Sequence, residues 1–211
     1  MARVLCGISG ALLLLAGLPA FTQTEDLAIG KLLVASRDLG DPNFAKTVIL
    51  LVHYNEDQGA VGLVLNKRTD VPISRVFRDL KEARGRSDLV YIGGPVGLNT
   101  LHFIHNCPDK IPNGIEIGGG LFWGGDFEIV KQLVSDYQLT EDDIKFFTGY
   151  SGWSTGQLES ELRENTWMVT DRIDMETVFG SEEQNLWKDS VIGLGHRYAH
   201  IANFPENPEL N

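Results

Sequence analysis

The chain has 211 residues, of which 43% are hydrophobic and 22% are charged, with 23 glycines and 8 prolines. This composition is typical of a globular protein and excludes a disordered, fibrous or polytopic membrane chain. Eighteen Lys and Arg residues stand against 29 Asp and Glu residues, which gives a formal net charge of -11. Because an acidic chain repels phosphate backbones, the charge argues against nucleic acid as a partner.

Residues 1–20 have the pattern of a secretory signal peptide. Arg3 is the only charged residue, an uncharged apolar run extends from Val4 to Leu18, and Pro19-Ala20 closes it before a plausible cleavage point. The run is shorter than the roughly 20 apolar residues that span a membrane. We therefore predict cleavage after residue 20 and a periplasmic or secreted protein without a membrane span. An uncleaved membrane anchor is the alternative.

Removal of residues 1–20 would take away Arg3 and Cys6, so the net charge would change from -11 to -12 and Cys107 would be the only cysteine. A single cysteine cannot form an internal disulfide. We expect Cys107 to be buried rather than reactive.

The rest of the chain, residues 21–211, is predicted to form a single domain. Runs rich in Val, Ile and Leu predict strands over 29–35, 47–53, 60–65, 89–92, 101–105, 144–147 and 166–170, with a glycine-rich turn or hairpin over 115–123. Apolar residues at helical spacing predict helices over 74–83, 126–137, 157–163 and 182–194. Because strands and helices do not alternate regularly, the predicted fold class is α+β with a mixed, largely antiparallel sheet.

Four local features carry specific expectations. Gly62 lies inside an apolar run, which predicts a bulge or the close approach of another backbone. Asp126 is the predicted N-cap of the helix that follows it. Asp41-Pro42-Asn43 predicts a turn in which Asp41 caps its own backbone. Residues 149–153 are interpreted as a turn that positions Trp153.

His102, His105 and Cys107 raise the question of a metal site, since these are zinc ligands in other proteins. On a strand, however, residues three apart point to opposite faces, so the two imidazoles diverge. Only a distortion around Cys107 could bring it to His105. We expect a structural or hydrogen-bonding role for the histidines and no metal.

Gly149-Tyr150-Ser151-Gly152-Trp153 comes close to the G-x-S-x-G motif of serine hydrolases, but Trp153 takes the place of the last glycine. A bulky indole does not suit the tight turn that exposes such a serine, so Ser151 is not expected to be a nucleophile. The chain also lacks the glycine-rich fingerprints of nucleotide sites, and no cofactor is predicted.

The acidic residues of the predicted helix 157–163 were considered as paired carboxylates. Glu159 and Glu161 are two residues apart and point away from each other, whereas Glu161 and Glu164 can share a face. We expect these side chains to face solvent, as most surface carboxylates do.

Two polar turns remain as candidate binding elements. Residues 152–159 combine glycines, hydroxyls, an amide and an indole before a helix, whose free N–H groups can bind a small anion or a carbonyl. A packed structural turn is the alternative interpretation. Residues 38–44 form the second turn. No catalytic residue is predicted, and the candidate binding residues are Asp41, Asn43, His53, Trp153, Gln157 and Glu159.

Several spaced motifs together resemble the YqgE/AlgH family, also called UPF0301 or DUF179. The similarity runs from about Ile29 to the C-terminus. It rests on Gly30–Ser36, Leu39, Asp41–Phe44, Thr47-Val48, His53, Gly59–Asn66, Gly93–Val96, Leu101-His102, Phe147–Trp153, Gly156–Glu159, Trp167 and Asn203–Asn211.

The resemblance implies an α+β fold with a bifurcated, barrel-like sheet surrounded by helices. It supplies no catalytic residues. Where family members commonly have alanine in G-Y-A-G-W, this chain has Ser151. The AlgH name reflects a proposed role in transcriptional regulation of alginate production. Many relatives have no signal peptide and are expected to be cytoplasmic, so a cytoplasmic location is a further alternative here.

Three functional hypotheses follow. The leading one is a non-catalytic binding or accessory protein of the cell envelope, whose partner is an unknown small ligand or envelope protein. The second is a hydrolase that uses His53 and Asp41 as acid–base groups, which requires both to meet the 152–159 turn in one pocket. The third is a transcription-linked regulator, which requires a cytoplasmic location and a basic surface.

Overall fold

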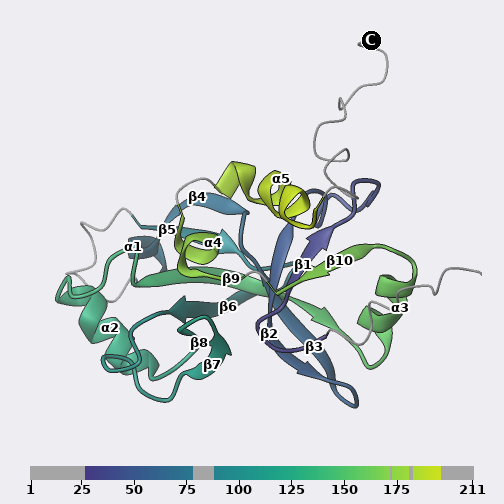
Figure 1. Ribbon diagram of the computed structural model, residues 1–211. Helices are drawn as coiled ribbons and strands as arrows, with labels where there is room; N and C mark the ends of the chain where they lie inside the picture. The colour runs from purple at the N-terminus through teal and green to yellow at the C-terminus, as the bar shows by residue number, and fades with distance from the viewer. Residues whose placement is uncertain (1–26, 78–87, 172, 181–182, 196–211) are drawn as a thin grey trace, which may run out of the picture.

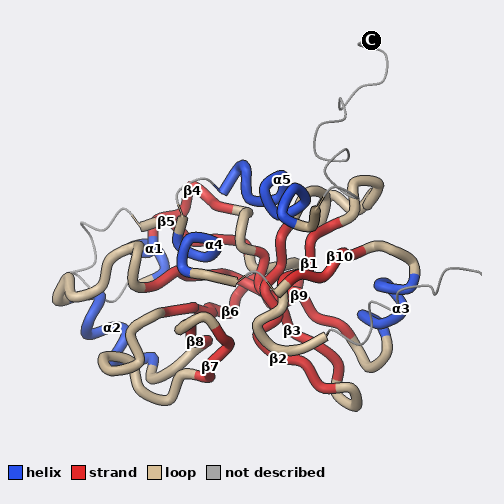
Figure 2. The backbone as a smooth tube through the Cα atoms, in the orientation of Figure 1, coloured by secondary structure: helices blue, strands red, loops and turns tan. Residues whose placement is uncertain are grey.

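The computed structural model describes residues 27–77, 88–171, 173–180 and 183–195 (Figure 1). The strands are β1 (Leu32–Ala35), β2 (Val48–Asn55), β3 (Gly59–Val64), β4 (Arg68–Pro72), β5 (Leu89–Ile92), β6 (Val96–His105), β7 (Ile115–Gly118), β8 (Leu121–Trp123), β9 (Ile144–Trp153) and β10 (Trp167–Thr170). The helices are α1 (Ile73–Val76), α2 (Phe127–Ser135), α3 (Gln157–Arg163), α4 (Met175–Phe179) and α5 (Glu183–Gly193). Strands run through the centre, and α2 and α3 lie at opposite ends of the view (Figure 2).

Within the described residues the strands form one open, forked sheet. Its main path runs in the order β10-β1-β2-β3-β9-β6-β8-β7, and β4 and β5 branch from it. The fork lies on β9, whose end pairs with β3 while its middle pairs with β5. The β5–β9 pair is parallel and the other pairs are antiparallel. The structure confirms the predicted α+β class and the bifurcated sheet, which is not closed into a barrel.

Backbone segments cross closely at the fork, and glycine makes this possible. Gly149 has φ +65°, and a Cβ atom there would lie 2.6 Å from the carbonyl oxygen of Gly94. A Cβ atom on Gly94 would lie 2.2 Å from the backbone of Tyr150. Larger residues would therefore separate the two segments. The prediction of a turn over 149–153 was wrong, because these residues continue β9 through a left-handed kink.

Four further predictions have definite outcomes. The irregularity predicted at Gly62 lies on the partner strand instead, because the register shift between Leu51 and His53 leaves the extra residue on β2, opposite Gly62 and Val61. Asp126 caps α2 as predicted, since its carboxylate accepts hydrogen bonds from the backbone N–H groups of residues 128 and 129. The predicted hairpin forms as β7 and β8. The helix predicted over 74–83 begins as α1, and residues 78–83 lie outside the described residues.

Three elements were missed for physical reasons. β4 is polar and mostly exposed because it pairs on one side only, with β5, so no apolar run marks it. The first half of β6, from Val96, is exposed for a similar reason. α4 is only five residues long and gives too few turns for a periodic pattern.

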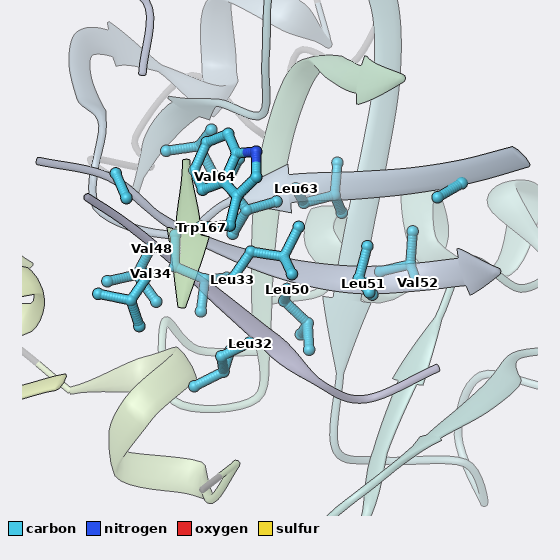
Figure 3. Close-up of a cluster of buried hydrophobic side chains, with 14 of the residues drawn as sticks. Leu32, Leu33, Val34, Val48, Leu50, Leu51, Val52, Leu63, Val64 and Trp167 are labelled. Atoms are coloured by element: carbon cyan, nitrogen blue, oxygen red, sulfur yellow. The ribbon is translucent and has the colours of Figure 1, made fainter. Parts of the chain in front are cut away.

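The main core lies on β1, β2 and β3, with the indole of Trp167 from β10 among their aliphatic side chains (Figure 3). All four residues of β1 and the first five of β2 are buried. Helix α3 contacts β3 and β10, whereas α5 contacts β1 and β2. Helix cover on these strands explains why they are continuous apolar runs rather than alternating ones.

A second core lies between α2 and the other part of the sheet, and it includes Phe77, Phe103, Val130 and Phe146. No helix in the described part of the chain is long and apolar enough to cross a bilayer. The predicted signal peptide, residues 1–20, lies outside the described residues, so its cleavage and the start of the domain at residue 21 stay predictions.

Candidate functional site

Glu161 of α3 joins two buried tryptophans. Its Oε2 atom accepts hydrogen bonds from Nε1 of Trp153 on β9, at 2.8 Å, and from Nε1 of Trp167 on β10, at 2.7 Å. The two rings meet edge to face, with centroids 6.1 Å apart. Both indoles are buried, with 6% and 2% of their surfaces exposed. The prediction of a solvent-facing carboxylate was wrong for Glu161, because it satisfies both indole N–H groups.

Gln157 extends this arrangement to the turn before α3. Its amide Nε2 donates to Oε1 of Glu161 at 3.0 Å. Its amide oxygen accepts from the backbone N–H and the hydroxyl of Ser154, at 3.1 and 3.0 Å. We call Trp153, Ser154, Gln157, Glu161 and Trp167 the indole–carboxylate network. The polar groups of Trp153 and Gln157, both predicted binding residues, thus find their partners inside the protein.

Glu159 points to a different neighbour, as its spacing from Glu161 predicted. Its Oε1 atom accepts a hydrogen bond of 2.8 Å from the hydroxyl of Tyr54 on β2. Burial, followed by this hydrogen bond and by the negative charges of Glu159 and Glu56, raises the pKa of Tyr54 to about 12. Thr155 also bonds the β2–β3 hairpin through the carbonyl of Asp57, at 2.9 Å. The 152–159 turn is therefore fixed on the hairpin.

The second predicted turn, residues 38–44, lies between β1 and β2. The carboxylate of Asp41 accepts from the backbone N–H of Asn43 at 2.8 Å, which confirms the predicted cap. Lys67 Nζ donates to the carbonyls of Pro42 and Asn43, at 3.0 and 2.6 Å. Burial lowers the pKa of Lys67. Phe44 packs edge to face on Trp167, with centroids 5.7 Å apart, so this turn contacts the indole–carboxylate network.

No hydrogen bond or ion pair joins His53 and Asp41 in the part of the chain that the structure describes. The Asp41 turn leads into the first residue of β2, Val48, whereas His53 lies five residues further along. At about 3.3 Å per residue, this separation is roughly 17 Å along the strand.

Other reactive side chains have structural partners. The hydroxyl of Ser151 is buried and donates to the carbonyl of Gly93 at 3.1 Å. The backbone N–H of Cys107 donates to Nδ1 of His105 at 3.3 Å, so Nε2 carries the imidazole proton and bonds the carbonyl of Gly124 at 3.1 Å. The thiol of Cys107 lies 3.9 Å from Nδ1. The chain is indeed distorted here, and it brings Cys107 to His105.

Burial favours the neutral forms of His105 and Cys107. Burial lowers the pKa of His105 and raises the pKa of the Cys107 thiol, which Asp143 raises further. His102 bonds the hydroxyl of Thr100 at 2.9 Å, and burial lowers its pKa too. The hydrogen-bonding roles predicted for both histidines are confirmed. Among the residues that the structure describes, no three His, Cys, Asp or Glu side chains are grouped to hold a metal ion.

A pocket of about 310 Å³ opens between the edge strand β10, its neighbour β1 and the helices α4 and α5. We call it the α4–α5 pocket. Its lining residues come from all four elements and the segments that join them: Leu32, Thr170, Asp174, Glu176, Thr177, Gly180, Leu186, Asp189, Ser190 and Gly193. None of them is among the predicted site residues.

The lining combines an apolar part with many oxygen atoms. Leu32, which is almost fully buried, and Leu186 are the apolar residues of the lining, and three acidic and three hydroxyl-bearing residues are its polar ones. Asp174 caps α4 by accepting from the N–H and the hydroxyl of Thr177, at 2.8 and 2.6 Å. The cap signal Asp174-x-x-Thr177 is visible in the sequence and could have revealed α4. The packing of α4 with α5 and β10 could not be predicted from this local signal.

Comparison with known proteins gives one consistent family. The family model described as AlgH-like, DUF179, matches residues 32–199. A UPF0301 protein from Chlorobaculum tepidum is 39% identical over 189 residues, which cover 90% of this chain and 98% of the relative. A UPF0301 protein from Parabacteroides distasonis is 37% identical over 192 residues, with 90% and 95% covered.

Solved structures agree with this assignment. The solution structure of the AlgH protein from Pseudomonas aeruginosa has a TM-score of 0.63 and 27% identity, and the match covers 84% of this chain and 94% of that one. Protein DIP2367 from Corynebacterium diphtheriae shares the fold, with a TM-score of 0.68 at 24% identity over 85% and 93% of the two chains. The matches confirm the resemblance read from the sequence motifs, and the chain belongs to the AlgH-like, UPF0301 family.

Proposed function

We propose that this protein is a non-catalytic binding protein of the cell envelope and that it takes a small ligand in the α4–α5 pocket. The pocket itself carries the proposal. Its volume of about 310 Å³ lies at the small end of the range of ligand sites, about 300–1,000 Å³. Its lining has the mixture of apolar surface and a few polar groups that such sites share.

The state of the reactive side chains supports a role without catalysis. Ser151 is buried and bonded to Gly93, and the pKa of the Cys107 thiol is raised, which disfavours the nucleophilic thiolate. Asp41 lies at the far end of β2 from His53. The residues considered for acid–base or nucleophilic chemistry are thus separated or engaged in structural hydrogen bonds.

The envelope location rests on residues 1–20 and on the charge. These residues have the basic start, apolar run and small closing residue of a signal peptide, and they precede the part that the family model matches. The net charge of -11 disfavours the DNA contacts of a transcription-linked regulator. Expression in a Gram-negative host, followed by cell fractionation and intact mass, tests this part. Periplasmic product shortened by residues 1–20 is expected, and an unprocessed cytoplasmic product would instead favour the regulator.

The pocket can be tested by filling it. Ser190 lines the pocket from α5, so Ser190→Leu places a larger side chain in it, whereas Ser190→Ala at the same position leaves it open. We expect a library of small metabolites, screened by thermal shift, to contain ligands that stabilise the native protein and Ser190→Ala but not Ser190→Leu. Stabilisation of all three proteins alike would place ligand binding elsewhere.

A further inference from the structure

We infer that the α4–α5 pocket binds a small organic cation, an ammonium group on a short apolar stem. This inference rests on the proposed function, because it names the ligand chemistry of the same pocket. Four observations lead to it: the sign of the lining charge, the absence of partners for two carboxylates among the described residues, the orientation of a hydroxyl, and the spread of the acidic side chains.

The first observation is charge. Asp174, Glu176 and Asp189 line the pocket, and no Lys, Arg or His is among its described lining residues. Lys31, next to Leu32 in the chain, forms an ion pair of 3.9 Å with Asp171, outside the pocket lining. A recess lined with one sign of charge concentrates ions of the opposite sign, and the net charge of -11 adds to this field.

The second observation concerns the partners of these carboxylates. Within the described parts of the chain, the side chains of Glu176 and Asp189 form no ion pair and accept no hydrogen bond. They belong to different helices, α4 and α5, so they approach the pocket from two sides. A bound ammonium group can therefore donate a hydrogen bond to either carboxylate without displacing a partner within the described structure.

The third observation is the direction of a hydrogen bond. The hydroxyl of Thr177 donates its only proton to Asp174 Oδ1, at 2.6 Å. Its oxygen can then only accept further hydrogen bonds, which suits a ligand that donates. An ammonium group donates three and accepts none.

The fourth observation separates an organic cation from a metal ion. The acidic side chains of the pocket are not grouped closely enough to hold an ion together, since no metal-binding cluster of three is found in the described residues. Leu32 and Leu186 line the same space, and apolar side chains do not suit the oxygen shell of Ca²⁺ or Mg²⁺. They do suit the methylene groups of an alkyl ammonium ion.

The test compares small probes that differ in charge. We would titrate the full, processed chain with butylammonium, 1,4-diaminobutane and tetramethylammonium, with neutral 1,4-butanediol, with the dianion adipate and with Ca²⁺. Amide chemical shifts report the site, and titrations at low and physiological salt report screening. We expect at least one ammonium probe to bind and to shift resonances of α4, α5 and β10, whereas the diol, adipate and Ca²⁺ leave them unchanged.

Isosteric variants test whether the charges of Glu176 and Asp189 contribute to ammonium binding. Glu176→Gln and Asp189→Asn are each expected to weaken ammonium binding about three- to tenfold, as loss of one partly exposed charged hydrogen bond does. Glu141→Gln removes the same charge from an exposed position beside β9 and is the matched control, expected to change the affinity less than twofold. Ser190→Leu is expected to abolish binding.

The outcomes separate this inference from the proposed function. If the diol or adipate binds and Ser190→Leu blocks it, the pocket is a ligand site and the inference of a cation is wrong. If Ca²⁺ shifts the same resonances and depends on Glu176 and Asp189, the site is a metal site and the inference is also wrong. If no ammonium probe binds, the inference is overturned. If, in addition, no library compound depends on Ser190, the proposed function is wrong as well.

Discussion

The two ends of β10 lead to two polar regions with opposite properties. At Trp167 the indole–carboxylate network is closed, because both oxygens of Glu161 accept from side chains of this same protein. Three residues further on, Thr170 lines the α4–α5 pocket, where Glu176 and Asp189 have no such partners in the described residues. A polar cluster that satisfies itself stabilises the fold, whereas carboxylates without internal partners are available to a ligand.

This difference changes the interpretation of the sequence motif. Residues 152–159 attract notice because they combine an indole, hydroxyls and an amide. In the structure these groups hold the start of α3 on β9 and on the β2–β3 hairpin, and Glu161 adds the hydrogen bond to β10. Three predictions test this division between a stabilising region and a binding region, beginning with the largest expected effect.

The first concerns Glu161. Glu161→Leu leaves the N–H groups of Trp153 and Trp167 buried without an acceptor, so we expect the free energy of unfolding to fall by about 2–4 kcal/mol. Glu161→Gln keeps one side-chain oxygen as acceptor and is expected to lose about half as much. Urea unfolding monitored by tryptophan fluorescence measures both changes.

Glu164→Leu is the control for Glu161. It is the C-cap residue of α3, is exposed and has a long contact of 3.4 Å with the hydroxyl of Ser160. Its effect should stay within about 0.5 kcal/mol, as for other surface substitutions. Equal losses at positions 161 and 164 would show that the indole hydrogen bonds do not stabilise the fold.

The second prediction is a pH dependence at the edge of the same region. The pKa of Tyr54 is raised to about 12 in the folded protein, against about 10 for a free tyrosine. The folded state thus favours the protonated phenol, and its contribution to stability is complete below pH 10 and is lost as the pH rises from 10 to 12.

Tyr54→Phe removes both the phenol and its bond to Glu159. We expect a loss of about 0.5–1.5 kcal/mol at pH 7, the net value of one hydrogen bond. We also expect this difference from the native protein to shrink between pH 10 and 12. Ultraviolet titration of the phenolate checks the pKa directly. A Tyr54 that titrates near 10 in the folded protein would show that Glu159 does not hold it.

Some strands and caps could be predicted from the sequence, and others could not. Apolar runs located β1, β2, β3, β5 and β10, because strands buried beneath helices must be apolar along their length. The cap at Asp126 was readable because it has a local physical cause. The course of residues 149–153 could not be predicted from the local sequence. Gly149 continues β9 at the place where this strand crosses Gly94, which lies 55 positions earlier in the chain.

Prediction of the candidate site was limited in the same way, by contacts between distant segments. Trp153, Gln157 and Glu159 were predicted as a group, and they do lie on neighbouring elements. Glu161, the shared partner of Trp153 and Gln157, was missed as a site residue because its two indole donors come from different strands, β9 and β10. The α4–α5 pocket exists only through the packing of distant segments, and no local pattern encodes that packing.

The third prediction concerns the smallest expected change in stability, at the two pocket carboxylates, and contrasts with the large change expected at Glu161. Glu176→Gln and Asp189→Asn remove charges that have no partners in the described structure, so each should change the free energy of unfolding by less than about 0.5 kcal/mol. A slight increase is reasonable, since removal of one of several like charges relieves repulsion in an acidic protein. Thermal and urea unfolding without added ligand measure this. If either variant lost as much stability as Glu161→Leu, its carboxylate would be part of the fold, and the division between the network and the pocket would not hold.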